Sequence, residues 1–139
     1  MKNLNAFLNP RRKENLKFIL SDAFCDDNSQ PIEWELRELS AQEMLEIQRL
    51  CEGRGMQETS LALAAESLVT PNIHDAELLA GLSKREGRTI LNPVEALRVM
   101  LSGSELSMLL YRYFQQQSVG NFEQMVSEAK NSSGEAATV

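Results

Sequence analysis

The sequence predicts an α+β fold, in which an N-terminal antiparallel β-hairpin packs on a bundle of about five to six short α-helices. Apolar and polar residues alternate within 14–24 and 32–36, as they do in strands that have one buried face. From Ser40 onward, apolar residues recur at helical spacing between capping residues. Because two strands alone are marginally stable in water, the apolar face of the hairpin is expected to rest on the helices.

The first thirteen residues are predicted to form an extended basic arm, numbered 1–13. Residues 1–17 carry a net charge of +4. Because the whole chain carries −6, residues 18–139 carry −10. An arm of this kind could contact an acidic partner or nucleic acid. Because five cations in the first 17 residues make a weak patch, we favour a solvated leader that opens the first strand.

The predicted hairpin consists of strands at 14–24 and 32–36, joined by the polar turn 25–31. Glu33 and Glu35 alternate with the apolar residues of the second strand and are expected to face solvent. The core candidates on the apolar face are Phe18, Leu20, Ile32, Trp34 and Leu36.

The predicted helices begin and end at recognisable capping and breaking residues. Ser40 and Glu43 form a capping box, and Asn92 precedes a proline at the first helical position. A charged loop is expected at 83–89. The helices are placed at 40–52, 58–69 and 75–82, and from residues 92, 104 and 121. Their core candidates are Met44, Ile47, Leu61, Leu68 and Leu97.

Together these elements predict a single α+β domain over residues 14–131, followed by a short tail. Residues 132–139 are small and polar, and are expected to be disordered.

Composition excludes several classes of function. The 14 Lys and Arg residues are outnumbered by 20 Asp and Glu residues, which argues against a general nucleic-acid binder. No stretch approaches the roughly 20 apolar residues of a membrane span, and the N-terminus has no apolar signal segment. We therefore expect a cytosolic protein that binds neither nucleic acid nor a membrane.

Residues able to carry chemistry are few and widely spaced. His74 is the single histidine, and no nucleophile motif accompanies it. Cys25 and Cys51 are distant from it and lack the close pairing of structural zinc ligands. Asp26 and Asp27 lie in a turn without calcium-loop spacing. We therefore expect no catalytic residue, no metal, no cofactor and no enzymatic activity.

The last two predicted helices carry apolar stripes that could form a partner-binding groove. The same spacing is typical of any helix that faces a core, so both interpretations stay open. The candidate partner-binding residues are Leu106, Leu109, Leu110, Tyr113, Phe114, Phe122, Met125 and Val126.

Seven segments, in order along the chain, resemble the XkdN-like tail assembly chaperones of long-tailed bacteriophages and prophages. They are NLNAFL (3–8), ENLKF (14–18), PIEWELR (31–37), PNIHDAEL (71–78), PVEAL (93–97), MLSGSE (100–105) and EAKN (128–131). The sequence departs from the family pattern at 83–91.

This resemblance implies a non-enzymatic chaperone in the cytoplasm of the bacterial host. Such chaperones coat the long, helical, hydrophobic tape measure protein while the tail tube assembles, and they are absent from the mature virion. Self-association of the chain is a further expectation. The alternatives are a small structural tail or connector subunit retained in the virion, and a host-directed adaptor that uses the basic arm.

Tail assembly chaperone genes often make a second, longer product by ribosomal frameshifting, whose extension is thought to recruit tail tube subunits. Ala129, Lys130 and Asn131 can be encoded by the slippery string A AAA AAC. A frameshift there would replace only 132–139. The resemblance thus also implies the tail tube subunit as a partner of a long form.

Overall fold

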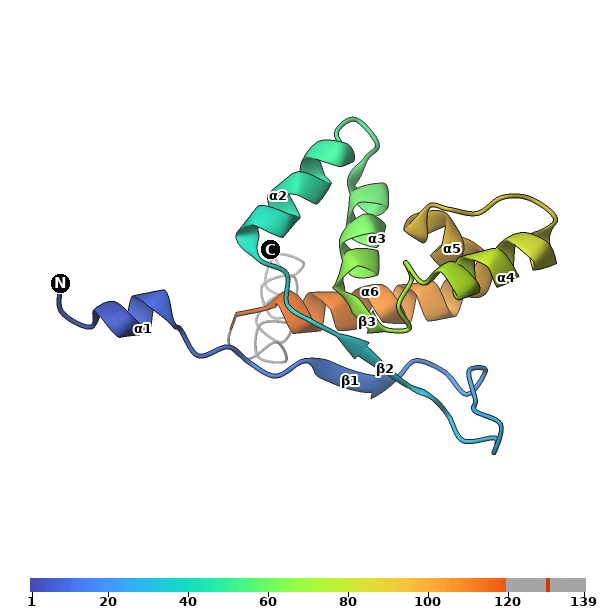
Figure 1. Ribbon diagram of the computed structural model, residues 1–139, viewed down its shortest axis with the longest axis horizontal. Coiled ribbons are helices and arrows are strands. Elements are labelled where there is room, and N and C mark those ends of the chain that lie inside the picture. The colour runs from blue at the N-terminus through green and yellow to red at the C-terminus, as the bar shows by residue number, and fades with distance from the viewer. Residues whose placement is uncertain (120–129, 131–139) are drawn as a thin grey trace, which may run out of the picture.

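A computed structural model describes residues 1–119 and residue 130 of the chain. Its helices and strands build the predicted α+β fold, with the hairpin near the N-terminus (Figure 1). The described helices are α1 (Leu4–Leu8), α2 (Ala41–Leu50), α3 (Met56–Ser67), α4 (Ala76–Glu86), α5 (Pro93–Met100) and α6 (Gly103–Gln117). The described strands are β1 (Leu16–Ile19), β2 (Glu33–Leu36) and β3 (Leu68–Thr70).

The described strands form an antiparallel sheet in the order β1-β2-β3. Phe18 pairs with Trp34 across the hairpin, so the two aromatic side chains share one face. β1 ends at Ile19, whereas the sequence placed its end near residue 24. The hairpin itself was predicted correctly, because strict alternation determines which face is buried.

β3 is an element that the sequence analysis missed. The helix predicted at 58–69 ends at Ser67, and the chain continues as a strand whose Leu68 pairs with Leu36. Val69 and Thr70 are β-branched and precede a proline, which disfavours helix and favours extended backbone. Pairing with β2 then decides for the strand.

The core lies between the sheet and the helices. Met44 and Ile47 are partly buried against it. Leu36, Leu61 and Leu97 are fully buried. Other predicted core residues that are buried are Phe18, Leu20, Trp34 and Leu68.

The prediction that Ile32 belongs to the core is wrong. Its side chain is 39% exposed, although it has the same parity as Trp34 and Leu36. Ile32 comes just before β2, at the turn end of the hairpin, and this end projects beyond the helices in Figure 1.

The prediction that the arm 1–13 is extended throughout is also wrong. Residues 4–8 form the one-turn helix α1, which begins after Asn3 in a left-handed conformation. The Asn9 side-chain amide donates to the Asn5 side-chain oxygen at 2.8 Å and ties the turn together. α1 buries none of its residues and stands apart from the body (Figure 1).

The loop predicted at 83–89 begins too early. Asp75 is the N-cap of α4, and the helix continues to Glu86 and ends at Gly87, whose φ is 71°. The Ser83 hydroxyl accepts a hydrogen bond from the Ile90 backbone N–H at 2.8 Å. This contact holds the chain after Gly87 against the last turn of α4. The first part of the charged segment is therefore helical, and the part after Glu86 forms the loop.

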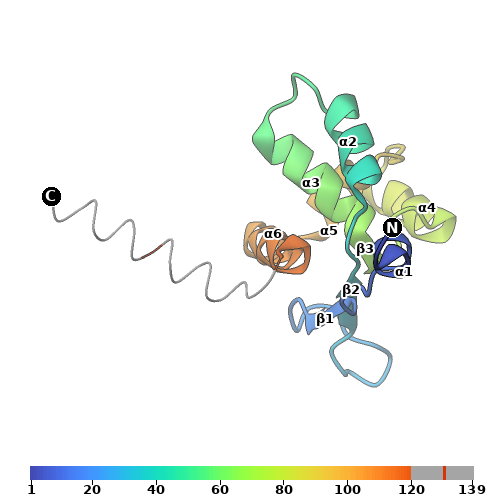
Figure 2. The same ribbon diagram turned by 90° about the vertical axis from the view of Figure 1, so that its left-hand side faces the viewer.

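α6 is the longest described helix and begins at a second capping box. Ser102 is its N-cap, and the Glu105 carboxylate accepts a hydrogen bond from the Ser102 backbone N–H at 2.8 Å. The last predicted helix and the tail 132–139 lie outside the described residues. In the turned view, α6 forms one edge of the described molecule (Figure 2).

Candidate partner-binding surfaces

The apolar stripe predicted on α6 divides into a buried side and an open side. Leu109 and Tyr113 are buried in the core, and burial raises the pKa of the Tyr113 phenol. These two residues cannot contact a partner without unfolding, so assigning them to a binding groove is wrong. The reason is that α6 packs directly on α3 and β2, which cover this side.

Three other residues of the predicted stripe form what we call the α6 strip, namely Leu106, Leu110 and Phe114. Their spacing of i, i+4 and i+8 places them in a shallow spiral along one side of the helix. Leu106 and Leu110 are partly buried against the core, whereas Phe114 is 48% exposed. Met108 and Tyr111 also expose large apolar surfaces on α6. Phe122, Met125 and Val126 lie outside the described residues.

A second apolar surface, which the sequence analysis did not find, is a groove between α2, α3 and the start of α5. Its volume is about 310 Å³. Apolar lining residues include Ile47, Leu50, Ala62 and Val94. We call it the α2–α3–α5 groove. Leu50 is the one residue whose position in the sequence could have indicated this groove, because it continues the apolar stripe of α2 to the last residue of the helix.

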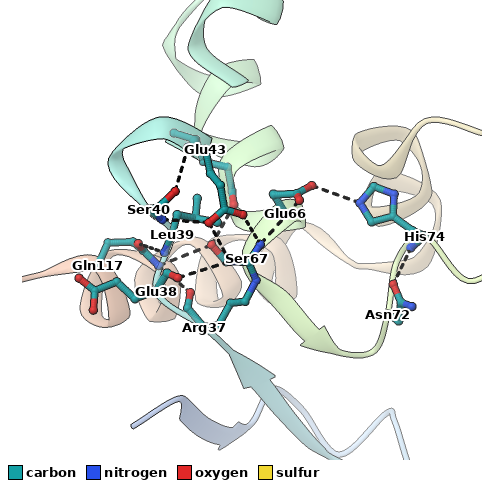
Figure 3. A network of polar contacts seen from close by, with 11 residues as sticks. Arg37, Glu38, Leu39, Ser40, Glu43, Glu66, Ser67, Asn72, His74 and Gln117 are labelled. Carbon is teal, nitrogen blue, oxygen red and sulfur yellow. Dashed lines mark hydrogen bonds and ion pairs between the residues drawn. The ribbon is translucent and has the colours of Figure 1, made fainter. Parts of the chain in front are cut away.

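A polar network holds the helices against the sheet between these two surfaces (Figure 3). Arg37, just after β2, donates to both carboxylate oxygens of Glu43 at 3.0 and 2.6 Å. The Glu66 carboxylate lies 3.7 Å from the same guanidinium. The bidentate contact with Arg37 and the N-cap backbone N–H lower the pKa of Glu43 to about 2.

Gln117 closes the network from the end of α6. Its amide oxygen accepts from the Leu39 backbone N–H at 3.0 Å, and its amide nitrogen donates to the Arg37 carbonyl at 3.0 Å. This double contact satisfies the backbone of the linker that joins β2 to α2. It therefore sets where α6 lies, and with it the position of the α6 strip.

His74 belongs to the edge of this network. Its Nε2 lies 3.2 Å from a carboxylate oxygen of Glu66, and its backbone N–H donates to the Asn72 side chain (Figure 3). This histidine thus links the start of α4 to α3 in the described structure. Cys51 is buried and Cys25 is exposed, and both are free thiols.

Among the described residues, no group of three or more His, Cys, Asp or Glu side chains could hold a metal ion. No helix in residues 1–119 is long and apolar enough to cross a membrane.

Exposed apolar helix faces on an α+β frame are typical of a protein that binds other proteins. The family model of the phage XkdN-like tail assembly chaperone proteins matches residues 4–130. The chain therefore belongs to the XkdN-like tail assembly chaperones. This family implies a non-enzymatic role in building a phage tail, and tail proteins as partners.

A solved structure shows the same fold. The chain is similar to the crystal structure of the protein yqbn, a structural genomics target, with a TM-score of 0.69 and 17% identity. The similarity covers 86% of this chain and 99% of that one. At this identity it establishes the fold alone. No match was found among curated proteins.

Proposed function

We propose that this chain binds the tape measure protein of a long-tailed phage or prophage and keeps it soluble while the tail tube assembles. The observation that carries the proposal is the α6 strip, where Phe114 is exposed and Leu106 and Leu110 are only partly buried. Tape measure proteins, as the family resemblance implies, are long, helical and hydrophobic. Such a partner offers the apolar helix face that the strip would cover.

The spacing of the strip fits a helical partner. Side chains at i, i+4 and i+8 form a ridge that packs into the groove between neighbouring side chains of another helix. Tyr111, which is three residues before Phe114, widens the surface beside the ridge, and Met108 exposes a further apolar side chain elsewhere on the helix. Methionine and aromatic side chains adapt to varied apolar partners, which suits a chaperone that binds successive segments of one long helix.

Co-purification with the tape measure protein tests this assignment. The chain and the tape measure protein are expressed together, and the yield of soluble complex is measured. Phe114→Asp should remove most of the complex, because it places a charge at the most exposed position of the apolar contact. Met56→Asp is the matched control, since Met56 is exposed on α3 away from the strip. Equal complex yields for both variants would refute the role of the strip.

The alternative function, a structural subunit that stays in the particle, predicts a different fate for the chain. As a chaperone, it acts in the host cytoplasm and leaves before the virion is complete. Mass spectrometry of purified virions should then find it absent or strongly depleted relative to tail subunits. A stoichiometric copy number in virions would establish the structural subunit instead.

We also propose that the chain is the short form of two products. The longer product would carry a different extension after Asn131 and would recruit the tail tube subunit. Lys130 is described, but Ala129 and Asn131 lie outside the described residues. The gene should read A AAA AAC at these codons, with an open −1 frame downstream. Other codons, or a closed −1 frame, would exclude a frameshift at this position.

A further inference from the structure

The N-terminal arm carries an apolar face that the rest of the described chain leaves open. Leu4, Phe7 and Leu8 lie at i, i+3 and i+4, so they share one side of α1. Phe7 is 67% exposed, and no residue of α1 is buried. A five-residue helix has little stability by itself in water. Packing of its apolar face against another surface is what normally stabilises such a helix. The arm therefore has the form of a docking segment.

The base of the arm is anchored, which sets where the docking segment begins. The Lys13 ammonium donates to the Ser118 carbonyl at 2.7 Å, just after the end of α6. The Gln116 side-chain amide donates to the Glu14 carbonyl at 3.5 Å. From this anchor the chain runs outward, and α1 lies well away from the sheet and the other helices (Figure 1).

The α2–α3–α5 groove offers an apolar site of matching size. Its volume of about 310 Å³ lies at the lower end of protein ligand pockets, which suits one or two apolar side chains. Leu50 stands at the end of α2 and is 76% exposed, although it lines the groove. An inserted phenylalanine or leucine would cover Leu50 and fill the groove.

The arm is basic, whereas the segment that carries α2 and α3 has a net negative charge. Residues 1–13 contain Lys2, Arg11, Arg12 and Lys13 and no acidic residue. The segment 41–67, which includes α2 and α3, contains five Glu and two Arg residues. Complementary charge of this kind steers two surfaces together and sets their orientation.

We propose that the arm of one chain inserts Phe7 and Leu8 into the α2–α3–α5 groove of a second copy of this chain. The second copy is favoured over the same chain because α1 extends away from the body, on the side of α2 that is opposite to α3 and α5 (Figure 1). Exchange of both arms between two copies gives a closed dimer with two identical contacts. The inference does not depend on the partner proposed for the α6 strip.

Light scattering after size exclusion tests the exchange on the full chain. The wild type is expected at twice the chain mass of 15.6 kDa, with the dimer weakening as salt concentration rises. Phe7→Asp removes the arm contact and Leu50→Glu removes the groove contact. Each variant alone is expected at the mass of one chain. Both positions are exposed, so neither change should disturb the core.

Mixing the two variants gives the sharper result. The Leu50→Glu chain keeps an intact arm and the Phe7→Asp chain keeps an intact groove, so an equimolar mixture should recover a species of twice the chain mass. Phe114→Asp is the control on the other surface and should leave the dimer unchanged, whatever it does to complex formation with the tape measure protein. A monomeric wild type, dimeric single variants, or a mixture that stays monomeric would each overturn the arm exchange.

Discussion

At the scale of single residues, burial separates side chains that the sequence pattern treats as equivalent. Ile32, Trp34 and Leu36 share one parity, yet the first is exposed at the end of the hairpin and the other two are buried. The Trp34 ring also meets Phe24 edge to face, with centroids 5.3 Å apart. The number of neighbours that each position finds, and not its parity, decides its contribution to stability.

Trp34→Ala is therefore predicted to cost about 3–5 kcal/mol of unfolding free energy, because it opens a large cavity in the core. Ile32→Ala is the matched control and is predicted to cost less than about 1 kcal/mol. Urea unfolding followed by circular dichroism measures both. A Trp34→Ala variant as stable as Ile32→Ala would show that the hairpin packs by its other face.

The ion pair of Arg37 and Glu43 predicts a defined pH dependence. The folded pKa of Glu43, about 2, lies below its ordinary value of 4.5. The stability that the carboxylate contributes is therefore fully present above pH 4.5 and is lost as the pH falls toward 2. Glu43→Gln should be less stable than the wild type at pH 7, and the gap should close as the pH approaches 2.

Unfolding free energies at pH 7 and at the lowest pH that still permits folding measure this gap. In an Arg37→Gln background, Glu43→Gln should cost less at pH 7 than it does in the wild type, since the partner is already gone. An unchanged gap at low pH would show that the stabilisation from Glu43 does not come from its charge.

At the scale of elements, helix caps are the features that can be predicted most directly from the sequence. Ser40 and Ser102 each form a capping box, and Asp75 and Asn92 each accept a hydrogen bond from their own helix. Such contacts join residues two or three positions apart, so no tertiary structure is needed to form them. The capping box at Ser40 was predicted, whereas the one at Ser102 was not, because the sequence analysis started this helix at residue 104.

Ser102→Ala is predicted to cost about 1 kcal/mol, because it leaves the first turn of α6 without its cap. Ser107→Ala, at an exposed position in the same helix, should be close to neutral. Thermal or urea unfolding of both variants compares the two serines directly. Equal losses would mean that the cap at Ser102 contributes no stability of its own.

At the scale of the whole molecule, the described residues build a hydrophobic core of their own. Its buried cluster runs from Phe18 to Tyr113. A chain that ends at Val119 is therefore predicted to fold with an unfolding midpoint close to that of the full chain. Loss of tape measure binding by this folded chain would assign Phe122, Met125 or Val126 to the contact. A truncated chain that fails to fold would instead place 120–139 in the core.

Alternation and helical spacing were sufficient to predict the fold class, the hairpin and most helix starts, because these depend on contacts between residues close in sequence. The resemblance carried by short ordered segments was sufficient to predict the family. Neither could predict β3, since Leu68–Thr70 becomes a strand by pairing with β2. Neither could separate Leu109 and Tyr113 from Phe114, because all lie on one apolar stripe of α6.

The sequence by itself thus determined most of the helices and strands and which side of each is apolar. The tertiary structure alone decided which of those apolar sides stay open, because burial depends on which elements pack against each other. Leu50 at the groove, Phe114 on the α6 strip and Phe7 on the arm are exposed for this reason. Helical periodicity indicates that one side of a helix is apolar, but it cannot indicate whether the protein itself or a partner covers that side.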